Sequence, residues 1–165
     1  PFPPGRPSDL LRVARLFDHA HILELAEHAT IPVINGLTDY NHPCQVMADY
    51  FTIREHLPKR EKPRVIYVGD GNNIVHSWLR LAMQLPLHFT CCCPQGYEPD
   101  AETVAAAREA GISTIEISHD PPAAVAGADG IDSDVWAPMC QKEDAEARGR
   151  AVAAFMGIKI GRAHA

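Results

Sequence analysis

The sequence predicts an α/β protein with a doubly wound parallel sheet, and three observations lead to this prediction. Short apolar and β-branched runs alternate with longer segments whose apolar residues recur at helical spacing. The connections between these segments are short, so helical crossovers join successive strands and the strands run parallel. Clusters of Gly, Asn or Asp follow several strands, at the edge where open α/β sheets place their ligand sites.

In the first third of the chain, apolar residues at helical spacing predict a helix over residues 19–29, followed by a short buried strand over 31–34. A second helix is expected between Asn41, as its cap, and Pro58, which ends it. Its buried side is predicted to carry the following residues: Val46, Met47, Tyr50, Phe51 and Leu57. Residues 7–13 show no strand pattern.

The remaining strands and helices follow in strict alternation. We expect strands over residues 64–68, 87–92, 114–117 and 130–132. The helices between and after them are expected over residues 74–84, 100–110, 121–128 and 141–155. Gly111 is placed to end the second of these helices. Together these elements form a four-strand α/β unit.

The polar stretch over residues 58–63 is the predicted domain boundary. It separates residues 1–57, with one strand and two helices, from the four-strand unit expected over residues 58–156. Residues 157–165 break the helical pattern abruptly, and we expect them to be a non-native tail.

Composition excludes several classes of partner. The net charge is −6 and there is no basic run, which argues against nucleic acid and anionic membranes as partners. No apolar run approaches the ~20 residues that span a bilayer. The five cysteines are odd in number, and three are consecutive at positions 91–93, without zinc-site spacing. The cysteines therefore indicate a buried strand in a reduced, cytoplasmic protein, with no metal site.

A glycine-rich turn, Gly69-Asp70-Gly71-Asn72-Asn73, joins a predicted strand to a predicted helix. Unpaired N–H groups and the positive end of the helix dipole suit such a turn to an anion. The dinucleotide fingerprint requires a third glycine where this chain has Ile74, which argues against a nicotinamide cofactor. A plain tight turn is the alternative interpretation.

Two other positions carry side chains suited to a ligand. His42 and Gln45 lie three residues apart in the first turn of a predicted helix, where both can face one ligand and donate to an oxygen atom. Asp132 and Asp134 lie at the end of the last predicted strand. The alternatives are a surface histidine beside a helix cap and ordinary turn chemistry.

Together these motifs resemble those of the aspartate/ornithine carbamoyltransferase family, over nearly the whole chain. The string from Asn35 to Asp49, with His42-Pro43-Cys44-Gln45 at its centre, is similar to the family's carbamoyl-phosphate motif. The resemblance implies that His42 polarises the carbamoyl carbonyl and that Gln45 binds the carbamoyl amide. It also implies that Arg15 reaches the carbonyl and the phosphate.

The other two motifs resemble the ornithine branch of the family. The turn Gly69 to Asn73, followed by His76-Ser77, implies that Asn73 binds the α-carboxylate of the amino acid. In the string from residue 134 to residue 139, Asp134 is implied to hold the α-amino group, and the backbone N–H of Met139 the carboxylate. Pro138 stands where the family pattern has Ser, so one hydroxyl and one N–H are lost.

The resemblance implies that a carbamoyl group passes from carbamoyl phosphate to the δ-amine of L-ornithine, giving citrulline and phosphate, without metal or organic cofactor. Residues 1–57 would be the C-terminal part of a carbamoyl-phosphate-binding domain with the inter-domain helix, and residues 58–156 a Rossmann-like ornithine-binding domain. The intact enzyme would be a homotrimer.

Two family loops do not occur in the sequence: the Ser-Thr-Arg-Thr phosphate loop and the His-Cys-Leu-Pro loop. We therefore expect this chain alone to be inactive, because transfer depends on positioning both substrates. Two alternatives stay open. One is a carbamoyltransferase for another amine, such as putrescine or acetylornithine, and the other is a non-catalytic module that binds an amino acid or an anion.

Overall fold

The structure, a computed structural model, describes residues 11–133 and begins with a small unit of two strands and one helix. Strands β1 (Arg12–Arg15) and β2 (Val33–Leu37) pair in parallel, and helix α1 (His19–His28) connects them. Asp18 caps α1 by accepting a hydrogen bond from the backbone N–H of Ala20 at 2.8 Å. The predicted helix over residues 141–155 and the tail over 157–165 lie outside the described residues.

The larger unit is a parallel four-stranded sheet, as predicted. Its strands are β3 (Arg64–Val68), β4 (His88–Cys92), β5 (Thr114–Ser118) and β6 (Gly130–Asp132), in the spatial order β5-β4-β3-β6. The chain builds outward from β3 to β5 and then returns to pair β6 with β3. The direction of winding therefore reverses beside β3, and open α/β sheets bind their ligands at the carboxyl ends of the strands at such a point.

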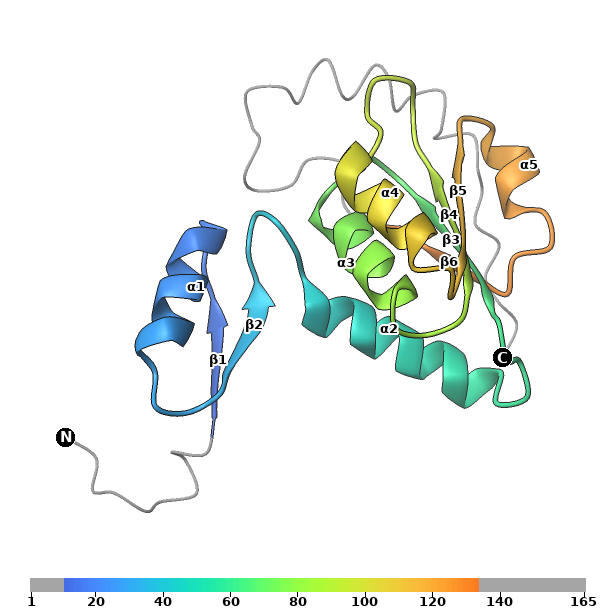
Figure 1. The fold of residues 1–165 in the computed structure, drawn as a ribbon. Coiled ribbons are helices and arrows are strands. Elements are labelled where there is room, and N and C mark those ends of the chain that lie inside the picture. The colour runs from blue at the N-terminus through green and yellow to red at the C-terminus, as the bar shows by residue number, and fades with distance from the viewer. Residues whose placement is uncertain (1–10, 134–165) are drawn as a thin grey trace.

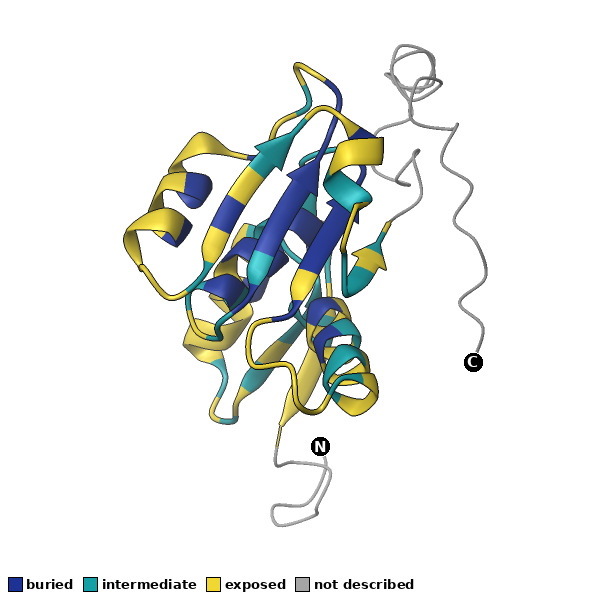
Figure 2. Ribbon diagram, turned by 90° about the vertical axis from the view of Figure 1, so that its right-hand side faces the viewer, coloured by how far each residue is buried: buried dark blue, intermediate teal, exposed yellow. Residues whose placement is uncertain are grey.

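Helices cover both faces of this sheet. Helices α2 (Pro43–His56), α3 (Asn73–Ala82) and α4 (Ala101–Glu109) share one core with the sheet, and α5 (Pro121–Val125) packs on the other face. Figure 1 shows α2 running from the small unit along the larger one, beside α3. Figure 2 shows burial concentrated in the central strands and sparse in the small unit. The described part of the chain contains no helix with the length and apolar character that a membrane crossing requires.

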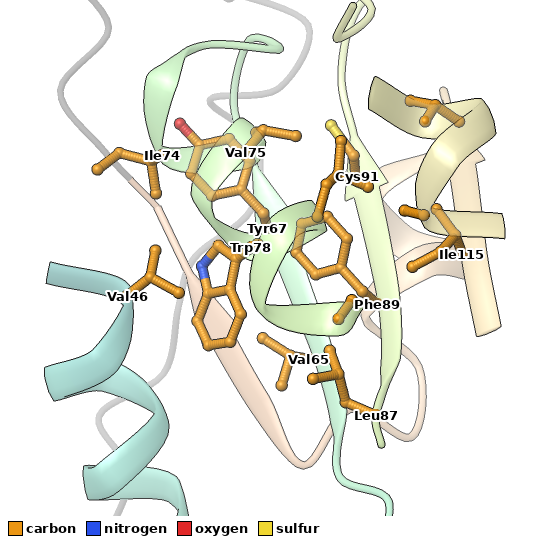
Figure 3. Packing of buried hydrophobic residues seen from close by; sticks show 14 of the residues in the cluster. Val46, Val65, Tyr67, Ile74, Val75, Trp78, Leu87, Phe89, Cys91 and Ile115 are labelled. Atoms are coloured by element: carbon orange, nitrogen blue, oxygen red, sulfur yellow. The ribbon is translucent and has the colours of Figure 1, made fainter. Parts of the chain in front are cut away.

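The core of the larger unit follows the alternation of side chains along each strand. Val65 and Tyr67 face the helices α2 to α4, and Ile66 faces α5. Figure 3 shows the indole of Trp78 between Val46 of α2 and the sheet, where it stacks on Phe89 at a centroid distance of 5.8 Å. The predicted burial of the three consecutive cysteines is confirmed, with Cys91, Cys92 and Cys93 each 0 % exposed.

Three expectations about the N-terminal third were wrong. A strand, β1, does precede the loop to α1, although Val13 within it is 63 % exposed and gives no apolar signal. Strand β2 lies later than residues 31–34, because Pro32 lacks a donor and the pairing continues through Gly36, where the register shifts. His42 occupies the cap position of α2, because the Asn41 side chain is turned toward Asn35 and Thr38.

The buried side of α2 is narrower than predicted. Val46 and Tyr50, one helical turn apart, are buried in the core of the larger unit. Met47 and Phe51 each follow one residue later, about 100° further around the helix, and they are 37 % and 59 % exposed. Exposed apolar side chains also lie on the small unit, where Leu23 is 58 % exposed.

Candidate functional site

The loop between β2 and α2 is organised by one buried hydroxyl group. Thr38 is 0 % exposed, and its Oγ1 accepts a hydrogen bond from the backbone N–H of Asn41 at 3.3 Å. The same oxygen lies 3.0 Å from Nδ1 of His19 and 3.5 Å from Nδ2 of Asn35. These contacts turn the chain sharply, so that α2 begins directly after His42.

His42 and Gln45 lie at the N-terminal end of α2, as predicted. The backbone N–H of His42 donates to Oγ of Ser77 on α3 at 2.7 Å, across 35 residues of sequence. Pro43 follows in the first turn, where a missing N–H costs nothing. Gln45 is exposed, and its Nε2 donates to Oδ1 of Asp49 one turn further along the helix, at 2.9 Å.

The glycine-rich turn after β3 places its two asparagines differently. Asn72 caps α3, because its Oδ1 accepts from the backbone N–H of Ile74 at 2.9 Å, and its Nδ2 donates to Oη of Tyr67 at 3.0 Å. Asn73 instead directs its Nδ2 to the carbonyl oxygen of Thr38, at 2.8 Å. The first asparagine shapes the turn, and the second faces the loop that precedes α2.

The turn also fits closely against the loop that follows β4. The backbone N–H of Gly71 donates to the carbonyl oxygen of Tyr97 at 2.7 Å. A Cβ atom at Gly71 would lie only 2.2 Å from the backbone nitrogen of Pro99. Only glycine fits this position, because the obstructing atoms belong to the backbone.

The N-terminal turns of α2 and α3 are therefore side by side. Ser77 Oγ, which accepts from His42, donates to the carbonyl oxygen of Asn73 at 2.7 Å. The predicted carbamoyl residue His42 and the predicted carboxylate ligand Asn73 are thus linked through one hydroxyl group. Two helix N-termini at one place favour an anion, because the positive ends of both helix dipoles meet there.

Arg15 lies at the carboxyl end of β1, opposite Leu37 in the parallel pairing. The carboxyl ends of β1 and β2 share one edge, so Arg15 is on the same edge as the loop that begins at Thr38. Its side chain is exposed and forms no hydrogen bond or ion pair with other residues in the 11–133 range. It remains available to an anionic ligand.

Strand β6 ends at Asp132, the first of the two carboxylates noted in the sequence. Asp132 pairs with Tyr67 of β3, and its Oδ2 accepts a hydrogen bond from Nε1 of Trp78 at 2.7 Å. The end of β6 therefore lies beside the turn that contains Asn73. Asp134, Pro138 and Met139 lie outside the described residues.

Aromatic and charged side chains surround Tyr40 where the two units meet. The ring of Tyr40 lies 5.0 Å from that of His19 on α1 and 5.5 Å from that of His76 on α3. Arg80 donates a hydrogen bond to the phenol oxygen and stands 5.1 Å from the ring, and this contact lowers the pKa of Tyr40. His76 Nδ1 contacts the carbonyl oxygen of Tyr40 at 3.1 Å.

Sequence reasoning assigned no role to Thr38, Tyr40, Ser77 or Asp49. The contacts by which Thr38, Tyr40 and Ser77 join the loop before α2 to helix α3 span 35 or more residues, so local sequence does not indicate them. For Asp49, the i, i+4 spacing from Gln45 was the available signal. Within residues 11–133, no three His, Cys, Asp or Glu side chains are grouped so as to hold a metal ion. The arrangement offers neutral donors, two positive helix ends and one exposed guanidinium, which suits an oxyanion or a polarised carbonyl.

Comparison with known proteins gives consistent results. Residues 8–55 match the family model of the carbamoyl-phosphate-binding domain of aspartate/ornithine carbamoyltransferases, and residues 61–164 match that of the Asp/Orn-binding domain. Ornithine carbamoyltransferase of Pisum sativum, a chloroplastic protein, is 61 % identical over 156 residues, which cover 94 % of this chain and 40 % of that protein. Ornithine carbamoyltransferase of Chlorobaculum tepidum is 50 % identical over 87 % of this chain and 42 % of its own length.

A solved structure shows the same fold. Ornithine carbamoyltransferase from Pyrococcus furiosus superposes with a TM-score of 0.76 at 43 % identity, over 86 % of this chain and 46 % of that one. The chain thus spans a little under half the length of these relatives. Both family models together match most of the sequence, and the chain belongs to the aspartate/ornithine carbamoyltransferase family.

Proposed function

We propose that the protein, completed to the length of its relatives, transfers a carbamoyl group from carbamoyl phosphate to the δ-amine of L-ornithine. The products are citrulline and phosphate. The observation that carries this proposal is the junction of the α2 and α3 N-termini, where Ser77 links His42 to Asn73. The names of the relatives, which are ornithine carbamoyltransferases, support the same substrates.

In this mechanism the neutral δ-amine attacks the carbamoyl carbon, a C–N bond forms, and the C–O bond to phosphate breaks. Charge accumulates on the carbonyl oxygen in the transition state, and hydrogen-bond donors placed there lower the barrier. His42 and Arg15 are the proposed donors to this oxygen, and Gln45 binds the carbamoyl amide. The phosphate departs with the electron pair of the C–O bond and takes up the proton that the amine nitrogen loses.

The ornithine side of the site uses residues of the larger unit. Asn73 is the proposed donor to the α-carboxylate, Asp134 the partner of the α-ammonium group, and the backbone N–H of Met139 a further carboxylate donor. The homotrimer, the reaction without metal or organic cofactor and the cytoplasmic location stay predictions. The chain alone is expected to be inactive, because its sequence lacks the two family loops named above.

The test is a completed protein, in which this chain replaces the region that it matches in the Pisum sativum relative. We expect it to form citrulline from carbamoyl phosphate and ornithine, while the isolated chain forms none. Replacement of His42 by alanine should lower kcat about a hundredfold, the usual effect of removing one oxyanion donor. A folded completed protein that forms no carbamoylated product would contradict the proposal.

A second candidate, transfer to another amine, is favoured by one observation. Pro138 stands where the ornithine pattern has Ser, and proline supplies neither a hydroxyl nor an N–H. The completed protein should therefore be assayed with ornithine, putrescine and N-acetylornithine. We expect Pro138→Ser to lower the KM for ornithine, because it restores a donor, and to leave the KM for carbamoyl phosphate unchanged. Higher turnover of another amine by the parent protein would favour the second candidate.

A further inference from the structure

The side chain of Gln45 is held in one orientation by a carboxylate on its own helix. Its Nε2 donates to Oδ1 of Asp49 at 2.9 Å, one turn along α2. Gln45 is exposed, and this is the one hydrogen bond of its side chain within residues 11–133, so Asp49 alone determines which end of the amide points along the helix. An ionised carboxylate only accepts hydrogen bonds, and it therefore selects the N–H end of the amide.

Among residues 11–133, the side chain of Asp49 accepts one hydrogen bond, the one from Gln45. Its Oδ2 is buried and has no hydrogen-bond partner among residues 11–133. The carboxylate lines a cavity of about 180 Å³ together with Trp78 of α3 and Asp132 of β6. Burial raises the pKa of Asp49, while the hydrogen bond from Gln45 opposes this shift. The amide of Gln45 is thus the contact that stabilises the charged carboxylate.

We propose that Asp49 is a positioning residue, which orients the Gln45 amide so that its Oε1 faces the carbamoyl-phosphate site. The inference rests on the proposed function, in which Gln45 binds the carbamoyl amide. That amide is an NH₂ group, and its partner must be an acceptor. With Nε2 committed to Asp49, the carbonyl end of Gln45 is the end left for the substrate. If the Gln45 amide were reversed, its N–H groups would face the NH₂ group of the substrate, and no hydrogen bond could form between two donors.

The first experiment observes Gln45 directly in the 165-residue chain. In ¹⁵N-labelled protein, the Nε2 resonances of Gln45 should shift when Asp49 is replaced by asparagine, which can accept or donate and so selects neither orientation. They should also titrate with the Asp49 carboxylate. Because Asp132 lines the same cavity, the titration is repeated in Asp132→Asn, where it should persist. If the chemical shifts of the Gln45 Nε2 resonances are the same in Asp49→Asn as in the parent protein, the proposal is overturned.

The second experiment is a double-mutant cycle in the completed protein. Asp49→Asn should raise the KM for carbamoyl phosphate about three- to tenfold with little change in kcat, the range expected for one hydrogen bond made equally in ground and transition states. In a Gln45→Ala background the same substitution should change the KM less than about twofold, because Asp49 then has no amide to orient. Glu55→Gln, which removes an equal charge from the same helix, is the matched control and should change neither constant.

The outcomes separate this inference from the function on which it rests. If Gln45→Ala raises the KM and Asp49→Asn does not, the role of Asp49 is overturned and the function stands. If Asp49→Asn raises the KM equally in both backgrounds, Asp49 does not act through Gln45 and the proposal fails. If the completed protein forms no product, the proposed function fails, while the Gln45 resonances still decide whether Asp49 orients the amide.

Discussion

At the scale of single residues, the two adjacent asparagines show how much the sequence predicts about this site. The pair after two glycines predicts a turn between a strand and a helix, and this turn is present between β3 and α3, while its binding of a ligand stays a prediction. Which asparagine caps the helix and which faces the neighbouring loop could not be predicted. The Asn72 amide donates to the phenol oxygen of Tyr67. The Asn73 amide donates to the carbonyl oxygen of Thr38, 35 residues away in the sequence.

Asn72→Ala is expected to lower the free energy of unfolding by about 1–2 kcal/mol, because α3 loses its cap and Tyr67 loses a donor. Asn72→Asp is the control, since its carboxylate keeps the capping interaction with the backbone N–H of Ile74. Urea denaturation of both variants measures the difference. If both variants lose the same free energy of unfolding, the capping hydrogen bond contributes nothing to stability.

The carboxylate of Asp129 predicts a pH dependence of stability. It accepts from Nε of Arg60 and from the backbone N–H of Arg64, each at 2.8 Å, and these contacts lower its pKa. A depressed folded-state pKa contributes stability that is complete above the usual aspartate value and is lost as the pH falls through the depressed value. Asp129→Asn should therefore destabilise the chain at pH 7, and the difference should shrink below about pH 4. Denaturation midpoints of both proteins across this range are the measurement.

At the scale of elements, prediction succeeded where burial supplies a strong pattern. Strand β3 was predicted with its observed bounds, because four of its five residues are buried. Strand β1 was missed, since it is held by pairing with β2 and buries little apolar surface. The register shift at Gly36 likewise depends on a neighbouring strand, so it lies beyond what local sequence can indicate.

The close fit of the glycine-rich turn after β3 against the loop after β4 can be tested by a substitution that adds one methyl group. Gly71→Ala should lower the free energy of unfolding by about 3 kcal/mol, because the new Cβ meets the Pro99 backbone and the loop must move. In Gly130→Ala the nearest atoms belong to the flexible side chain of Ile53, at 3.2 Å, so a loss of only about 1 kcal/mol is expected. Thermal unfolding of both variants decides between these values.

At the scale of the whole molecule, the two units are joined by hydrogen bonds as well as by chain connectivity. The larger unit contains the main core, and within residues 11–42 only Ile22 and Thr38 are buried. Ser77, His76 and Asn73 of α3 contact the loop over residues 38–42. The motifs predicted that both units carry site residues, but only the structure identifies the hydroxyl that connects them.

Ser77→Ala should leave the N–H of His42 without its acceptor, at a cost of about 1–3 kcal/mol. The hydrogen exchange of the His42 amide should accelerate, because the hydrogen bond that is lost joins the loop before α2 to helix α3. The exchange of the β3 amides should stay unchanged. Ser113→Ala is the matched control, since Ser113 accepts from Leu87 and donates to Leu85 away from the junction. An unchanged His42 exchange rate would mean that Ser77 does not connect the units.

The burial of Trp78 has an optical consequence. Its indole is 0 % exposed and donates to Asp132 beside the end of β6, while its helix begins at Asn73. A shielded indole fluoresces at shorter wavelength than one in water, and the chain has only one other tryptophan, Trp136. With Trp136 replaced by phenylalanine, the fluorescence comes from Trp78 alone. The wavelength of its emission maximum then reports whether α3 and β6 stay packed together as ligands are added.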